Sequence, residues 1–150
     1  MLMKLHYFMN VKMDLKVKKK WLIKFKVDIN KENESGETPL FKACKCGNKE
    51  IVEYFVEAGA DINKENKDGE TPLFRTCQER VKEQIYFTCK NDMKSIVNYL
   101  IEHGADINKE NSNGETPLFY ACKNGNLALV VYLAKFGVDI NKKIRMVKPS

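Results

Sequence analysis

Gly-Glu-Thr-Pro-Leu-Phe stands at Gly36–Phe41, and the same six residues return at Gly69–Phe74 and Gly114–Phe119. A second motif, Asp-Ile-Asn, lies between and around these copies, at Asp28–Asn30, Asp61–Asn63, Asp106–Asn108 and Asp139–Asn141. Self-similarity at a period near 33 residues is typical of stacked repeat units rather than of one globular fold. The sequence therefore predicts an array in which each unit packs on its neighbours.

The reference repeat, residues 31–63, fits a turn followed by two helices. Asn33 and Gly36 suit the turn because both tolerate a positive φ. The Thr38 hydroxyl is expected to cap the first helix, with Pro39 at the first helical position. Apolar residues then recur at helical spacing on one face of each helix: Leu40, Ala43 and Cys44 on the first, and Ile51, Val52, Phe55 and Val56 on the second. Gly47-Asn48 separates the two helices, and Gly59 ends the second.

These residues resemble a known family. Thr-Pro-Leu-Phe-Lys-Ala at 38–43, Gly47 with Val52, and Gly-Ala-Asp-Ile-Asn at 59–63 are similar to the ankyrin pattern Gly-x-Thr-Pro-Leu-His-x-Ala, Gly-x-x-x-x-Val, Gly-Ala-Asp-x-Asn. The resemblance covers about residues 17–141 and implies an all-α solenoid of stacked helix-turn-helix units with hairpin-like connecting loops. The family's usual His is Phe41, Phe74 and Phe119 here. We expect stacking of these rings to replace the hydrogen bond that this His makes between repeats.

The middle repeat is longer than its neighbours. Residues 31–63 and 109–141 are 33 residues each, whereas residues 64–108 carry 12 more. Leu-Phe-Arg-Thr-Cys at 73–77 matches Ile-Tyr-Phe-Thr-Cys at 85–89, which indicates a duplicated first-helix segment. Because a shift of 12 residues rotates a helix face by roughly 120°, one straight helix cannot bury both copies. We expect one copy in the stack and the other, with residues 78–84, as a helical extension or bulge. The residues do not decide which copy packs, nor whether the insertion contacts a partner or is merely tolerated.

Both ends of the array are irregular. Residues 17–30 form a partial first repeat in which Lys18-Lys19 stand at the positions of Ile51-Val52 and Lys26 at that of Gly59. Residues 1–16 are an N-terminal segment that fits a decayed first-repeat helix, although the alternation over residues 11–18 also fits a strand. Residues 142–150 form a basic tail. Ala128 and Val131 replace the outward Glu50 and Glu53, so the last unit ends on an apolar face that the tail or a further repeat would cover.

Composition narrows the class of protein. The net charge is +6, with +6 in residues 1–30, +4 in residues 142–150 and −4 in the repeats between them. No stretch approaches the roughly 20 apolar residues that span a bilayer, and no signal peptide is apparent, so we expect a cytoplasmic protein that could also enter the nucleus. The five cysteines include three at one repeat position, Cys44, Cys77 and Cys122, where a small apolar residue suits a packed helix. We expect reduced thiols, no metal site and no cofactor.

No constellation for catalysis stands in the sequence, so an enzyme is not expected. A stacked array instead offers an extended concave surface, and the family resemblance implies that it binds a protein through the hairpin tips and the first helices. Carried over by repeat position, the candidate protein-binding residues are Glu34, Ser35, Glu37, Lys42, Lys45, Lys67, Asp68, Glu70, Arg75, Gln78, Ser112, Asn113, Glu115, Tyr120, Lys123 and Asn124, with Cys46 and Glu79 beside them. Arg75 and Tyr120 are of the types that dominate binding hot spots. The outward row Glu37, Glu70 and Glu115 suggests a partner with basic character.

A second hypothesis belongs to another class. Some ankyrin repeats are substrates of asparagine hydroxylation with Leu eight residues before the target, and Leu100/Asn108 and Leu133/Asn141 have this spacing, as does Leu22/Asn30. The chain would then be a regulatory appendage or a modification substrate within a larger ankyrin protein, with Asn108 and Asn141 as the candidate sites. A third hypothesis, contact with nucleic acid or membrane through the Lys-rich flanks, is disfavoured. We expect a monomer with an unidentified protein partner and no small-molecule substrate.

Overall fold

The computed structural model describes residues 14–78 and 92–141. Its helices are α2 (Leu15–Lys24), α3 (Pro39–Lys45), α4 (Lys49–Glu57), α5 (Pro72–Gln78), α6 (Asp92–Glu102), α7 (Pro117–Lys123) and α8 (Leu127–Ala134). No strand occurs within these two ranges. The predicted all-α class is thereby confirmed.

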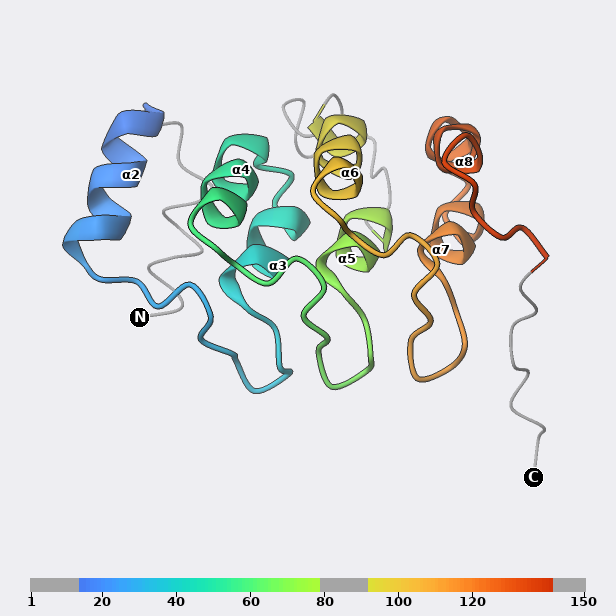
Figure 1. Ribbon diagram of the computed structural model, residues 1–150, viewed down its shortest axis with the longest axis horizontal. Coiled ribbons are helices and arrows are strands. Elements are labelled where there is room, and N and C mark those ends of the chain that lie inside the picture. The colour runs from blue at the N-terminus through green and yellow to red at the C-terminus, as the bar shows by residue number, and fades with distance from the viewer. Residues whose placement is uncertain (1–13, 79–91, 142–150) are drawn as a thin grey trace.

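The helices stack as successive pairs joined by long loops (Figure 1). The short first helices α3, α5 and α7 form one row, and the second helices α4, α6 and α8 form another, with α2 against α4. The loops before each first helix project from the same side of the stack as hairpins. This arrangement confirms the predicted solenoid of helix-turn-helix units.

The core runs continuously between the two rows. In the reference repeat, all six predicted inward residues from Leu40 to Phe55 are fully buried, whereas Val56 is half-buried. Burial of one large aliphatic or aromatic side chain stabilises the fold by about 1.5–3 kcal/mol. Because the same positions are filled in the next repeats, by Leu73, Cys77, Ile96, Val97 and Leu100 and then by Ala121, Leu129 and Leu133, each unit shares its core with its neighbours.

The middle repeat uses the first copy of its duplicated segment. Leu73, Phe74 and Cys77 are buried in α5, which occupies the first-helix position between α3 and α7. This copy directly follows the hairpin and Pro72, so it inherits the turn that starts every first helix. The second copy, residues 85–89, and the predicted extension over residues 79–84 lie outside the described residues.

The N-terminal unit contains a helix rather than a strand. Asp14 caps α2 by accepting a hydrogen bond from the Lys16 backbone N–H, so residues 15–18 are helical and the helix begins before the predicted boundary at residue 17. Lys18 is only 4% exposed at the position of Ile51, where its aliphatic stem covers the core. Lys26 adopts a φ of +45° at the position of Gly59 and so ends the helix as a glycine would.

One expected cap is absent in the first repeat. Thr38 occupies the N-cap position of α3, but its hydroxyl accepts no capping hydrogen bond, whereas Thr116 accepts one from the Phe119 N–H at 3.4 Å. Asn48 and Asn126 cap the second helices by accepting from the third backbone N–H beyond them, at 3.2 and 3.1 Å. Helices α4 and α8 therefore have N-terminal caps that α3 of the reference repeat lacks.

Candidate protein-binding face

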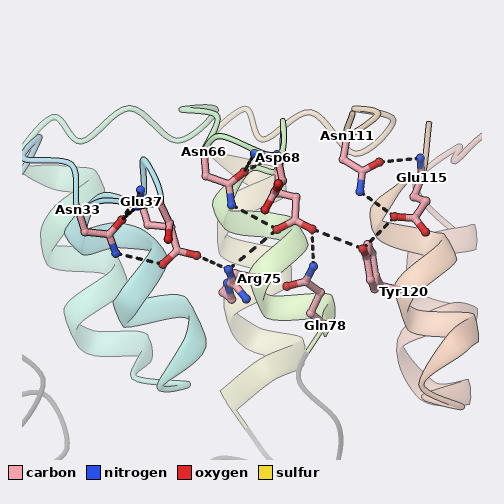
Figure 2. Close-up of polar contacts among 11 residues, drawn as sticks. Asn33, Glu37, Asn66, Asp68, Arg75, Gln78, Asn111, Glu115 and Tyr120 are labelled. Atoms are coloured by element: carbon pink, nitrogen blue, oxygen red, sulfur yellow. Dashed lines mark hydrogen bonds and ion pairs between the residues drawn. The ribbon is translucent and has the colours of Figure 1, made fainter. Parts of the chain in front are cut away.

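An asparagine organises each hairpin. Asn33 Oδ1 accepts hydrogen bonds from the backbone N–H groups of Ser35 and Glu37, both at 2.9 Å. Its amide nitrogen donates to the Glu37 carboxylate at 3.4 Å. The same set of bonds recurs around Asn66 and Asn111 (Figure 2). The spacing of four residues from Asn to Glu in every copy was visible in the sequence and could have identified this bond.

Backbone hydrogen bonds join neighbouring hairpins. The Lys67 N–H donates to the Ser35 carbonyl at 3.0 Å, and the Ser112 N–H donates to the Asp68 carbonyl at 2.8 Å. Gly69 sits at this junction with φ +74°, and a Cβ there would lie 3.0 Å from the Ser112 nitrogen. The tips therefore form one connected edge.

The three carboxylates that follow the hairpin glycines are held within the stack. Glu37 pairs with Arg75 of the next repeat. Glu70 is 7% exposed and accepts from Gln78 at 2.6 Å and from Tyr120 of the following repeat at 3.4 Å. Glu115 accepts from the Tyr120 hydroxyl at 2.9 Å. Figure 2 shows these groups as one chain of polar contacts across three repeats, which we call the carboxylate ladder (Glu37, Glu70, Glu115, Arg75, Gln78 and Tyr120).

The expectation of an outward acidic row is therefore wrong. Glu70 is buried, and Glu37 and Glu115 are half-buried with their oxygens engaged. Burial and the hydrogen bond to the Glu115 carboxylate raise the pKa of Tyr120 to about 12. Burial by itself would raise the pKa of Glu115, but hydrogen bonds from Asn111, Tyr120 and Asn113 outweigh it and lower that pKa below its ordinary value. Both shifts favour a charged Glu115 beside a neutral Tyr120.

Four residues predicted to contact a partner make polar contacts within the array. Arg75, Tyr120 and Asn124 bond to neighbouring repeats, and Gln78 donates to Glu70 of its own repeat. Asn124 donates to the carbonyls of Cys77 and Gln78 at 3.3 and 2.8 Å and so satisfies the C-terminal end of α5. The Tyr120 ring meets Phe74 edge to face at 6.0 Å. Aromatic contact between repeats thus involves Phe74 with Tyr120, which modifies the expected stacking among the three phenylalanines.

The comparisons with known proteins agree with this architecture. The family model described as ankyrin repeats (3 copies) matches residues 14–85 and residues 82–144. The chain belongs to the ankyrin-repeat family. The first match includes one copy of the duplicated segment and the second match includes the other, which fits a duplication inside an ankyrin repeat. A comparison with curated proteins found no match.

The ankyrin frame leaves a smaller set of predicted residues accessible. The exposed ones are Glu34, Ser35, Lys45, Lys67, Asp68, Ser112, Asn113 and Lys123, and Lys42 and Cys46 are half-buried. The Lys123 ammonium lies 5.7 Å from the Tyr120 ring centroid and 5.8 Å from that of Phe119. We call the surface formed by these hairpin tips and first-helix residues the hairpin face. Glu79 lies outside the described residues.

The two asparagines considered as modification sites differ in their surroundings. Asn108 Oδ1 accepts from the Asp139 N–H at 3.0 Å, as Asn63 Oδ1 does from the Asp106 N–H at 2.8 Å. This position therefore links residues 31–63 to the middle repeat, and the middle repeat to residues 109–141. Asn141 occupies the same position in the last repeat and is exposed.

The ankyrin array also contains histidine, cysteine and carboxylate side chains outside the carboxylate ladder. In residues 14–78 and 92–141, no three His, Cys, Asp or Glu side chains are grouped so that they could hold a metal ion. None of the helices described is long and apolar enough to cross a membrane. Burial raises the pKa of both the Cys44 and Cys77 thiols to about 12.

Proposed function

We propose that this ankyrin domain is a non-enzymatic module that binds a protein partner through its hairpin face. Ankyrin repeats generally mediate protein–protein interaction and are typically without catalytic activity. The hairpin face consists of hairpin tips and first helices. Backbone hydrogen bonds between hairpins and the shared core fix their positions. A rigid, preorganised surface limits the entropy lost on association.

The observation that carries this proposal is the contrast between buried and exposed positions of the repeats. The Thr-Pro-Leu-Phe residues are identical in all three copies and form the frame. The exposed positions around them differ from repeat to repeat: Glu34, Lys67 and Ser112 at one tip position, and Ser35, Asp68 and Asn113 at the next. On the first helices, the exposed Lys45 and Lys123 correspond to the half-buried Gln78. Folding has no need of this variety, whereas recognition of one particular partner does.

A photo-crosslinking amino acid placed along the chain tests the proposal in the cells that produce the protein. Substituted for Lys45 or Lys123 on the first helices, it should capture the same protein, identified by mass spectrometry. Substituted for Lys20, which is exposed on α2 away from the hairpin face, it should not capture that protein. Equal capture from Lys20, or capture of no common protein from the two face positions, would overturn the proposal.

A modification substrate within a larger ankyrin protein is the second candidate function, and Asn141 favours it. Its side chain is exposed at the end of the described array, whereas Asn108 links two repeats. Leu133, eight residues earlier, is fully buried, so an enzyme that reads both residues would act on an opened last repeat. Peptide mass spectrometry of natively produced protein should then find one added oxygen on Asn141 in preference to Asn108. Unmodified Asn at both positions would reject this candidate.

A further inference from the structure

The carboxylate ladder changes the charge that the hairpin face offers to a partner. Glu37, Glu70 and Glu115 receive hydrogen bonds from the ladder and from the hairpin asparagines. The Arg75 charge is directed at Glu37 and Glu70. Arg75 balances one of these three charges, and the hydrogen bonds direct the carboxylate oxygens into the stack, away from direct contact with a partner. Direct ion pairs with a partner therefore fall to the charged side chains of the face that are not engaged in the ladder.

The remaining charges on the first helices are all positive. The helices α3, α5 and α7 read Pro-Leu-Phe-Lys-Ala-Cys-Lys, Pro-Leu-Phe-Arg-Thr-Cys-Gln and Pro-Leu-Phe-Tyr-Ala-Cys-Lys and contain no Asp or Glu. Within the described ranges, neither Lys42, Lys45 nor Lys123 makes an ion pair, although the Lys123 charge helps to lower the pKa of Glu115. Lys45 and Lys123 are exposed in the last turns of α3 and α7.

We propose that the partner segment recognised by the hairpin face is an acidic peptide that crosses α3, α5 and α7. This inference rests on the proposed function and reverses the charge expected of the partner from the sequence. Packed helices lie roughly 8–10 Å apart, so α3 and α7 are separated by about 20 Å. An extended chain covers that distance in about six residues. The fitting segment therefore carries carboxylates at two points about six residues apart, one for Lys42 and Lys45 and one for Lys123.

An acidic peptide fits this face better than a nucleic acid does. Lysines occupy the first helices, but Glu34 and Asp68 are exposed at the hairpin tips beside them. A phosphate backbone has a charge at every nucleotide and would bring several of them close to these carboxylates. A peptide can place acidic residues against the lysines of the first helices and neutral or basic residues against the carboxylates of the hairpin tips.

A random-peptide display library tests the inference with the full chain as bait. Peptides of about 12 residues, roughly 40 Å when extended, are selected on the purified protein and measured by fluorescence anisotropy. The salt concentration is about 0.15 M, where exposed charges are screened beyond about 8 Å. The selected peptides should be enriched in Asp and Glu. The variant K42Q/K45Q/K123Q should bind them about tenfold more weakly, since three modest ion pairs are lost together.

Two further variants test whether the effect on peptide binding comes from the lysines of the hairpin face. K42E/K45E/K123E should weaken binding more than the Gln variant, and circular dichroism checks that it is folded, because acidic residues in the last turn of a helix are unfavourable. K16E/K20E/K135E makes the same change of charge at exposed positions outside the face and should alter affinity less than about twofold.

The possible outcomes separate the inference from the function on which it rests. Selected peptides that are neutral or basic, or that bind the Gln variant equally well, overturn the acidic partner but leave a binding module. Failure to select any peptide that binds this face counts against the proposed function itself. A labelled single-stranded RNA that binds more tightly than the peptides, and is lost in the Gln variant, would replace the acidic peptide by a nucleic acid.

Discussion

At the scale of single residues, Glu70 accepts more side-chain hydrogen bonds than the other two carboxylates of the carboxylate ladder. Its carboxylate accepts from Asn66 at 3.3 Å, from Gln78 at 2.6 Å and from Tyr120 at 3.4 Å. E70A would leave the side-chain amides of Asn66 and Gln78 without this acceptor, while Tyr120 keeps its bond to Glu115, so we expect it to lower the free energy of unfolding by about 2 kcal/mol. Urea denaturation followed by circular dichroism measures the loss.

Two further variants serve as controls for the effect of E70A on stability. E34A removes a carboxylate that is exposed at a hairpin tip and should change stability by less than about 0.5 kcal/mol. E70Q keeps one acceptor oxygen and should fall between the two. If E70A were no more destabilised than E34A, the ladder would have no structural role, and Glu70 would return to the list of partner contacts.

The cysteines should differ in reactivity although three share one repeat position. Cys44 and Cys77 are buried with pKa values raised to about 12, whereas Cys122 is exposed on α7. Because the thiolate is the reactive form, iodoacetamide at neutral pH should label Cys122 in the folded protein and reach Cys44 and Cys77 only on unfolding. Peptide mass spectrometry after timed quenching checks the order. Equal rates at Cys77 and Cys122 in the folded protein would contradict the buried assignment.

The orientation of the glutamates could be predicted only in part from one repeat, because the spacing indicates the bond from the hairpin asparagine but not the partner in the next repeat. Spacing within a repeat identified the turn, the Pro39 start and the buried face of each helix, because those depend on neighbours in the chain. The direction of Glu37 depends on Arg75, which is 38 residues away and reaches back from the next repeat. Tyr120 similarly approaches Glu70 from 50 residues away. Contacts between repeats need the stacking geometry, and one-dimensional spacing does not contain it.

At the scale of elements, the junction between hairpins depends on Gly69. An alanine there would meet a positive φ and also the Ser112 backbone nitrogen at 3.0 Å. Gly125 has a similar φ, +68° against +74°, but open space around the added carbon. Both alanine variants should lose roughly 1 kcal/mol to left-handed strain, and G69A should lose about 1 kcal/mol more from the backbone contact. Urea denaturation of the matched pair isolates that difference, and equal losses would show that the hairpins can separate freely.

The choice between the two copies in the middle repeat also belongs to this scale. The apolar patterns of residues 73–77 and 85–89 are nearly equivalent, so hydrophobic periodicity could not rank them. The discriminating feature is the preceding hairpin: Asn66 holds Glu70, and Thr71-Pro72 then starts α5. Residues before the second copy, Glu83-Gln84, provide no comparable start. The turn and the apolar face taken together therefore predict that the first copy packs in the array.

At the scale of the whole molecule, the second helices α4 and α6 present side chains at equivalent positions, which we call the outer row, to the repeat that follows. On α4, Glu53 and Glu57 lie near Tyr99 and, after burial, help to raise its pKa. On α6, the Lys94 ammonium lies 4.9 Å from the Tyr132 ring centroid, and Asn98 accepts a hydrogen bond from the Tyr132 hydroxyl. The outer row is polar on both α4 and α6, because the Tyr99 and Tyr132 side chains of the following repeats place a hydroxyl beside it.

On α8 the equivalent row is apolar, with Leu127 72% exposed and Val131 51% exposed. The replacement of the outward Glu53 by Val131 was predicted from the sequence, whereas the exposure of Leu127 was not, and both exposures are found over the described part of the chain. L127K/V131E restores the residue types of Lys49 and Glu53, which form an ion pair at 3.3 Å on α4. Because both side chains are exposed and the new pair has i,i+4 spacing, we expect the free energy of unfolding to change by less than about 0.5 kcal/mol. Fluorescence of a hydrophobic dye such as bis-ANS should fall, since the apolar patch is removed.

The control for this variant lies on the same helix. L129A truncates a side chain that is 3% exposed and should lower the free energy of unfolding by about 2–5 kcal/mol without reducing dye binding. Together the two variants distinguish the outer row of α8 from its core face. If L127K/V131E unfolded as readily as L129A, the outer row would be part of the core of the array. If its dye binding equalled that of the unmodified protein, the patch would already be covered in solution.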